Sequence, residues 1–130
     1  MQKLHVLTRV PEHIVDTPSH ITGQQRWQRS YNVAGWIRFE RQDDSPVRLL
    51  LRVQDAAGAR DVPVDNTKLN SKTLLLSGVA NLKLTGRIER MELLLQSEHD
   101  THSVDELFVQ PVKEKAKTNP ARRVTWGVSE

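Results

Sequence analysis

Hydrophobic and polar residues alternate along most of this 130-residue chain. The clearest stretch is residues 31–40, where every second residue is apolar or glycine and most of the others are polar. The same alternation returns over residues 4–10, 47–54 and 91–96. Successive side chains of a strand point to opposite faces, so this pattern predicts strands with one buried face. No segment of the sequence keeps a helical period over three turns, and we therefore expect an all-β fold.

Turn-forming residues separate these runs and set the expected connections. Residues 42–46 read Gln-Asp-Asp-Ser-Pro, so we expect residues 31–54 to form a hairpin that continues into a meander. A second turn at residues 56–58 leads to a short strand over Arg60–Val64. Pro63 places that strand at the edge of a sheet, because proline has no N–H to donate to a neighbouring strand.

The other segments are less regular. Residues 12–29 contain a proline, a glycine and a run of polar residues, which predicts a long loop with one short strand near His13–Val15. Residues 73–85 are expected to form one strand bent at Gly78, or two shorter strands. The last strand is expected over residues 104–109 and ends at a proline.

Strands at intervals of about 8–12 residues, with turns between them, are typical of a β-sandwich or barrel. We therefore expect a single antiparallel β-sandwich over residues 1–112, followed by a basic C-terminal tail over residues 113–130. A chain of 130 residues fits one domain of this kind.

Leucine triplets occur three times in the expected strands, at residues 49–51, 74–76 and 93–95. The outer two leucines of a triplet can fill the core, whereas the middle one points to the other face of its sheet. Either the N-terminal segment or the long loop covers these middle leucines, or they form an apolar patch used in assembly or ligand contact. The three middle residues are Leu50, Leu75 and Leu94.

The composition excludes several classes of protein. Hydrophobic residues make up 37% of the chain, which is too many for a disordered protein, and no apolar run approaches the ~18 residues of a membrane span. The absence of cysteine excludes disulfide scaffolds, thiolate zinc sites and cysteine nucleophiles. Polar residues interrupt residues 1–10, so this segment does not read as a secretory signal. We therefore expect either a cytoplasmic protein or an exported form without its signal, and favour the exported form.

The tail over residues 113–130 carries the excess positive charge of the chain. It contains five basic and two acidic residues, so its net charge of +3 equals that of the whole chain. Residues 1–112 therefore have a net charge of zero. A solvated end, contact with an anionic polymer and docking onto a partner by β-augmentation are all open interpretations. The residues that would make these contacts are Lys113, Lys115, Lys117, Arg122, Arg123 and Trp126.

Catalytic motifs are absent from the sequence. It contains no G-x-S-x-G, no H-E-x-x-H and no glycine-rich phosphate loop. His99 and His102 are close enough along the chain to share a metal ion, but their spacing fixes no third ligand. We therefore expect a solvated turn at this point, no metal site, no cofactor and no enzymatic activity.

Aromatic residues are the candidates for ligand contact, because a flat ring stacks on the apolar face of a sugar while nearby polar groups bond its hydroxyls. Trp36 alternates with apolar residues beside Arg38, and Trp27 lies in a polar loop. A structural role for either tryptophan, as a partly buried indole or a loop anchor, is the alternative. The candidate ligand-binding residues, including three from neighbouring strands, are Trp27, Tyr31, Trp36, Arg38, Arg48, Arg52 and Gln96.

Three motifs resemble those of jelly-roll carbohydrate-binding modules. Residues 31–38 read Tyr-Asn-Val-Ala-Gly-Trp-Ile-Arg, which is similar to a strand that reads Tyr-x-Val-Ser-x-Trp-Val-Arg in such modules. Residues 75–78 look like their Leu-x-Gly turn, and residues 103–111 look like their final strand, in which an aspartate precedes two apolar positions. The resemblance covers residues 15–112 and implies a jelly-roll-like sandwich that binds glycans.

These observations favour a non-catalytic binding module, with a glycan as the expected ligand, on a sheet face or in a groove at the loop rim. Two alternatives stay open. One is a structural or accessory subunit of a larger protein assembly, which would use the apolar sheet face and the tail. The other is a protein that binds an anionic polymer through the tail.

Overall fold

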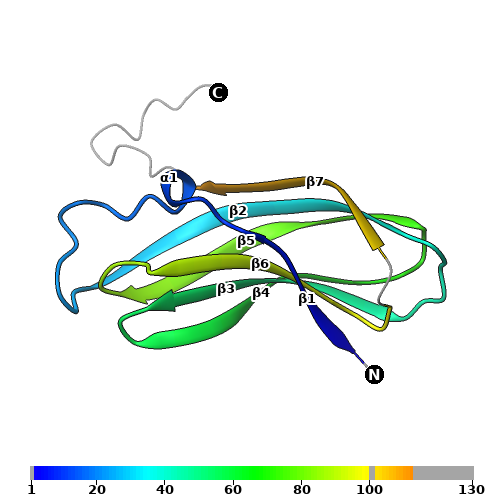
Figure 1. The fold of residues 1–130 in the computed structure, drawn as a ribbon, viewed down its shortest axis with the longest axis horizontal. Coiled ribbons are helices and arrows are strands. Elements are labelled where there is room, and N and C mark those ends of the chain that lie inside the picture. The colour runs from blue at the N-terminus through cyan, green and yellow to red at the C-terminus, as the bar shows by residue number, and fades with distance from the viewer. Residues whose placement is uncertain (1, 100–101, 113–130) are drawn as a thin grey trace, which may run out of the picture.

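The computed structural model describes residues 2–99 and 102–112 of the chain. These residues form a four-stranded sheet in the order β1-β6-β3-β4 and a three-stranded sheet in the order β5-β2-β7, with every strand pair antiparallel. Figure 1 shows the three-stranded sheet stacked above the four-stranded sheet, with the strands along the long axis. The predicted all-β antiparallel sandwich is confirmed. Its elements are β1 (Lys3–Arg9), α1 (Glu12–Val15), β2 (Arg26–Phe39), β3 (Pro46–Asp55), β4 (Gly58–Lys68), β5 (Thr73–Thr85), β6 (Arg90–Ser97) and β7 (His102–Pro111).

The core lies between the two sheets and is filled by alternate residues of each strand. Val33 and Ile37 of β2 are at most 1% exposed, and Leu49 of β3 and Leu93 of β6 are fully buried. Burial of one such side chain stabilises the fold by about 2 kcal/mol, so the alternation determines which side of each strand faces inward. The alternation in the sequence correctly predicted the inward orientation of these four residues.

Strands β2 and β3 belong to different sheets, so the prediction of a hairpin over residues 31–54 is wrong. The loop after β2 carries the chain from one sheet to the other. It is held by the backbone N–H groups of Asp43 and Asp44, which both donate to the Leu69 carbonyl at 3.1 Å. Alternation shows which side of a strand is buried but not which strand pairs with it, and this explains the error.

The predicted turn at residues 56–58 joins β3 and β4 as a hairpin. Strand β4 is longer than the expected Arg60–Val64, and it lies at the edge of its sheet as Pro63 predicted. Strand β5 runs through Gly78 without interruption. Glycine is required there because a Cβ atom would overlap the Val64 carbonyl oxygen, where β4 passes β5.

Residues 12–15 form one helical turn, so the prediction of a short strand near His13–Val15 is wrong. The turn ends at Asp16, which has a left-handed conformation with φ of 53° and donates its N–H to the Glu12 carbonyl. The Val15 carbonyl accepts the Tyr31 hydroxyl at 2.5 Å, which fastens the turn to the core. Strand β2 begins at Arg26, so the connecting loop is shorter than expected.

Candidate functional site

A groove of about 730 Å³ lies at one end of the sandwich, where the loop over residues 16–25 passes beside the start of β2 and the end of β7. We call it the rim groove. Its walls combine one aromatic ring with several polar side chains and a few aliphatic ones. The lining residues are Asp16, Pro18, His20, Ile21, Gln25, Trp27, Gln28, Arg29, Ser30, Pro111 and Val112.

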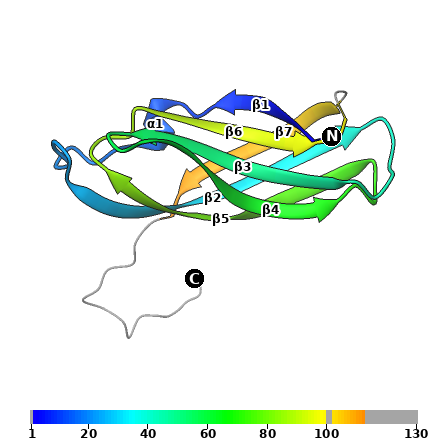
Figure 2. The same ribbon diagram turned by 90° about the horizontal axis from the view of Figure 1, so that it is seen from below.

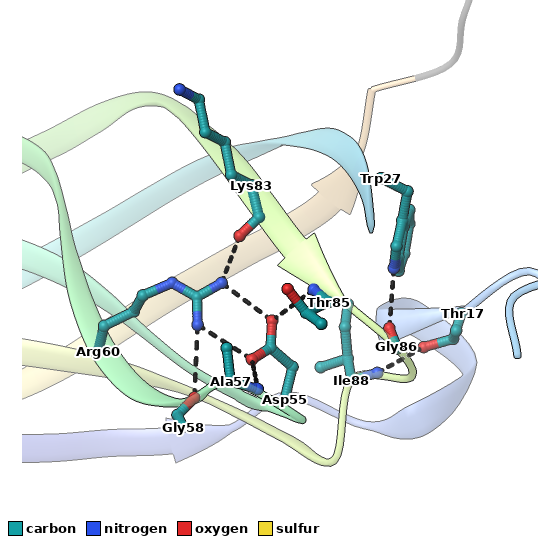
Figure 3. A network of polar contacts seen from close by, with 10 residues as sticks. All are labelled: Thr17, Trp27, Asp55, Ala57, Gly58, Arg60, Lys83, Thr85, Gly86 and Ile88. Atoms are coloured by element: carbon teal, nitrogen blue, oxygen red, sulfur yellow. Dashed lines mark hydrogen bonds and ion pairs between the residues drawn. The ribbon is translucent and has the colours of Figure 1, made fainter. Parts of the chain in front are cut away.

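Trp27 forms the aromatic wall of the rim groove and is held in place by two contacts. Its indole N–H donates to the Gly86 carbonyl at 2.8 Å, as Figure 3 shows. The Arg29 guanidinium lies 5.3 Å from the ring centre and donates to the Asp16 carbonyl at 2.5 Å. Trp27 lies in β2 and packs partly against the core, so its predicted position in a polar loop is wrong. The same contacts give its ring a fixed position beside the groove.

The loop of the rim groove packs closely on the turn between β5 and β6. Gly86 has a φ of 68° and donates its N–H to the Gln25 carbonyl at 2.8 Å. A Cβ atom at this position would overlap the Gly23 carbonyl oxygen, so only glycine allows the two backbones to approach. Thr17 adds a contact by accepting the Ile88 N–H at 3.3 Å, which Figure 3 also shows. The backbone around the rim groove is therefore held in place by contacts within the protein.

A buried ion pair below this turn joins the two sheets. The Asp55 side chain is fully buried and accepts hydrogen bonds from Arg60 and from the backbone N–H groups of Ala57 and Thr85. Arg60 also donates to the Lys83 carbonyl of β5, so the hairpin of the four-stranded sheet is tied to the three-stranded sheet (Figure 3). Burial alone would raise the pKa of Asp55, but the hydrogen bonds outweigh it and hold the pKa below its usual value.

Two amide side chains of the rim groove are free to meet a ligand. Gln25 and Gln28 are exposed, and neither side chain makes a hydrogen bond within the described part of the chain. The hydroxyl of Ser30, in contrast, is bonded to Asn81. Free amides beside a fixed indole can donate and accept hydrogen bonds at the same time, which suits a ligand rich in hydroxyl groups.

The outer face of the three-stranded sheet carries four large exposed hydrophobic residues, which we call the apolar face: Trp36, Leu75, Val79 and Phe108. They are 41–49% exposed. Trp36 of β2 stands opposite Leu75 of β5 in the strand register, so the two side chains are neighbours. The prediction that Trp36 and Leu75 project away from the core is confirmed.

The outer face of the four-stranded sheet differs, although it also carries leucines. Leu50 and Leu94 stand opposite each other on β3 and β6, but they are only 6% and 0% exposed. They point away from the core side, as predicted, and lie among longer polar side chains of the same face. Arg52, for example, makes two hydrogen bonds to Asp61 at 2.7 and 3.0 Å.

The residues predicted to bind a ligand do not share one surface. Trp36 and Arg38 lie on the three-stranded sheet, whereas Arg48, Arg52 and Gln96 lie on the four-stranded sheet. The expected combination on one face is therefore wrong, because the strands that follow β2 in sequence are not its partners in space. Trp27 lies apart from both sets, in the rim groove.

Tyr31 is fully buried, so its prediction as a ligand-contacting residue is wrong. It follows the same alternation as Val33, which places its ring in the core. Burial raises the pKa of its hydroxyl, which donates to the Val15 carbonyl instead of facing solvent.

Several residues of these surfaces were not predicted. Asp16, His20 and Gln25 line the rim groove, but the sequence alone does not show that their loop meets the end of β7. Val79 and Phe108 of the apolar face had a usable signal, because each alternates with a buried neighbour, Ala80 or Val109. The predicted contacts of the tail, at Lys113, Lys115, Lys117, Arg122, Arg123 and Trp126, lie outside the described residues.

Three histidines gather where β1, β6 and β7 meet. The rings of His5 and His102 are 5.1 Å apart, and His99 lies 2.8 Å from Asp43. The turn is thus partly packed, in contrast to the solvated turn expected from the sequence. Burial, followed by the nearby His5, lowers the pKa of His102. Within residues 2–99 and 102–112, no group of three or more potential ligands is arranged to hold a metal ion.

Comparisons of the chain with protein families, with curated proteins and with solved structures found no match. Among the residues that the structure describes, none belongs to a helix with the length and hydrophobicity needed to cross a membrane. The argument for a function therefore starts from the rim groove and the apolar face.

Proposed function

We propose that this protein is a non-catalytic binding module that holds a glycan in the rim groove. The observation that carries the proposal is the position of Trp27, whose ring is fixed at a groove of about 730 Å³ that Gln25 and Gln28 also line. This volume is in the range of pockets that bind small ligands.

Sugar recognition depends on two kinds of contact. The apolar face of a pyranose packs on an aromatic ring, and its hydroxyls require groups that both donate and accept hydrogen bonds. Trp27 supplies the ring, and Gln25 and Gln28 supply the amides. The hydrogen bond from Trp27 to Gly86 orders the ring before binding, so little conformational entropy is lost when the ligand arrives.

The sequence motifs support the same proposal. The stretch that resembles jelly-roll carbohydrate-binding modules, residues 15–112, includes all the residues that line the rim groove. Of the two locations expected from the sequence, a sheet face and a groove at the loop rim, we therefore propose the groove.

A binding role without catalysis fits the carboxylates. Glycoside hydrolysis generally uses two carboxyl groups on either side of the bond. Asp16 is the single carboxylate among the described residues that line the rim groove. Asp55, the buried carboxylate nearby, is fully engaged by Arg60 and two backbone N–H groups. No pair is therefore placed to act on a bound sugar within the described residues.

Isothermal titration of the full chain with a panel of soluble oligosaccharides and polysaccharides tests the proposal. We expect at least one glycan to bind, and the double variant Gln25→Ala/Gln28→Ala to weaken it by about tenfold or more, because each lost hydrogen bond is worth about 1 kcal/mol. Gln54→Ala, an exposed glutamine on the other sheet, is the matched control and should bind as the parent does.

Trp27 is tested by its conservative variant, since its removal disturbs packing. Trp27→Phe keeps a stacking ring but loses the N–H that bonds to Gly86. We expect weaker binding by this variant, with a free energy of unfolding in urea that matches the parent to within about 1 kcal/mol. A panel in which no glycan binds, or a glycan whose affinity is unchanged in the Gln25→Ala/Gln28→Ala variant, would contradict the proposal.

A further inference from the structure

The apolar face is a continuous exposed surface on the three-stranded sheet. Trp36 is opposite Leu75, and Phe108 is opposite Ala34, the next outward residue of β2. Val79 is opposite Asn32, one step further along. The four large residues therefore lie on three successive rows of the same face, and each is 41–49% exposed.

We propose that a second copy of this chain covers the apolar face, with the two three-stranded sheets packed face to face. Contiguous exposed hydrophobic residues on a soluble domain mark interaction surfaces. Trp36 and Phe108 belong to the residue types that are enriched at protein interfaces, and Trp36 stands on the central strand of this face. Sheets pack in this way in β-sandwiches, at a separation of about 10 Å.

The charges at the two ends of the face are the reason for choosing a second copy. Arg26 and Lys83 face outward at the end where β2 begins. Asp105 and Glu106 face outward at the other end, on β7. Arg38 pairs with Asp105 at 2.9 Å, and Glu106 has no ion-pair partner within residues 2–99 and 102–112. The face is thus basic at one end and acidic at the other.

A two-fold axis that lies in the plane of contact and runs perpendicular to the strands turns one copy over onto the other and reverses its long axis. The basic end of each copy then lies over the acidic end of its partner, while the apolar rows meet in the middle. Two identical faces are thereby complementary in charge as well as in hydrophobicity. A partner with uniform charge would meet repulsion at one of the two ends.

The size of the face sets the expected strength of the dimer. Three strands about 4.8 Å apart and about ten residues long at about 3.3 Å each give a face of roughly 450 Å². Stable complexes bury about 800 Å² on each partner, so this contact should be weak, with a dissociation constant in the micromolar range or above. A monomer at low concentration is therefore expected.

Sedimentation velocity of the full chain, from about 5 μM to about 1 mM, tests the proposal directly. We expect the sedimentation coefficient to rise from that of a monomer toward that of a dimer. Leu75→Lys and Phe108→Lys each place a charge in the middle of the contact and should abolish the rise. Val6→Lys is the matched control, because Val6 is 56% exposed on the other sheet, and it should dimerise like the parent.

A charge exchange tests the two-fold arrangement. Lys83→Glu alone and Glu106→Lys alone should each weaken the dimer several-fold, and the double variant Lys83→Glu/Glu106→Lys should recover most of the loss. Recovery is not expected if the two copies pack with like ends together.

Three results would overturn the proposal. One is a strict monomer at about 1 mM, which would mean that a partner other than a second copy covers the face. Another is a dimer that persists in both Leu75→Lys and Phe108→Lys. The third is a dimer in which the double charge exchange is weaker than either single variant. Glycan titration of Leu75→Lys distinguishes a failure of this proposal from a failure of the proposed glycan binding. That substitution lies outside the rim groove and should leave glycan affinity unchanged.

Discussion

The outer faces of the two sheets carry the same sequence feature with opposite results. Each contains the middle residue of a leucine triplet, which points away from the core. Leu94 on the four-stranded sheet is fully buried, and Leu50 beside it is 6% exposed. Leu75 on the three-stranded sheet is 47% exposed. The triplet therefore predicts the direction of a side chain but not its exposure.

The neighbours on the same face account for the difference. Leu50 and Leu94 lie on the two central strands of their sheet and stand between rows of long side chains, including Arg48, Arg52 and Gln96. Such side chains can lay their aliphatic stems over an apolar surface and keep their polar ends in water. Among the described residues, Figure 1 and Figure 2 show no helix beneath this sheet, so the cover comes from the face itself.

Leu75, in contrast, lies on the edge strand β5, and its neighbours along that strand are the short residues Thr73 and Ser77. The lesson is that the outer face of a sheet can bury its own hydrophobic residues when their neighbours are long. A face with short neighbours leaves such residues exposed.

The largest effect expected from this comparison is on stability. Leu94→Ala should lower the free energy of unfolding by about 3 kcal/mol, because it removes a fully buried side chain and leaves a cavity. Leu75→Ala should change it by less than about 0.5 kcal/mol, as for other exposed positions. Urea unfolding at about 1 μM, where the proposed dimer is dissociated, measures both. Equal losses in the two variants would remove the distinction between the faces.

A substitution at Asp55 affects both sheets, so it provides a reference for the Leu94 and Leu75 variants, each of which affects one sheet. Asp55→Asn removes the charge that pairs with Arg60 and weakens the tie between β3, β4 and β5. We expect a loss of about 2 kcal/mol, less than for a fully buried pair because the Arg60 side chain is 36% exposed. Asp61→Asn, in the exposed pair with Arg52, should cost about 0.5 kcal/mol or less under the same urea conditions.

Much of the fold could be predicted because alternation records burial directly. Val33, Ile37, Leu49 and Leu93 were assigned to the core from this pattern alone, and all four are buried. The partners of each strand could not be predicted, because β2 pairs with β5 and β7, which are far from it in sequence. The pattern of β2 would be the same beside any other half-buried strand.

The candidate site was less predictable than the fold, for the same reason. Trp36 and Arg38 were placed correctly on an outer face, since their position depends only on β2. The rim groove depends on Asp16, Trp27 and Val112, which come together only when the loop over residues 16–25 meets the end of β7. No local pattern in the sequence contains that contact.

A smaller effect on stability separates the contribution of the aliphatic part of the Arg52 side chain from that of its charge. If the stem covers Leu50 and Leu94, Arg52→Met should keep the parent stability to within about 0.5 kcal/mol, whereas Arg52→Ser should lose about 1 kcal/mol. If the ion pair with Asp61 is what matters, the methionine variant should lose as much as the serine variant. Urea midpoints of the two variants decide between these causes, and equal losses would show that the cover over the leucines is not made by this side chain.

The smallest expected effect is on the pH dependence of stability, and it concerns the contact between two histidines of different sheets. His102 of β7 packs against His5 of β1, and burial followed by this neighbour lowers its pKa from the usual 6.5. Above pH 6.5 the ring is neutral in both the folded and the unfolded chain, and its contribution to stability is complete. As the pH falls below 6.5 the unfolded chain takes up the proton first, so stability decreases until the pH passes the lower pKa of the folded protein.

We therefore expect the urea midpoint of the parent to decrease as the pH is lowered from about 7 to about 5. His102 contributes at most one proton that the chain takes up on unfolding. His102→Asn should flatten that part of the curve, whereas His13→Asn, at an exposed position on α1, should leave it unchanged. An unchanged slope in His102→Asn would mean that this junction does not carry the acid sensitivity. The loss would then have to come from other titratable groups of the protein.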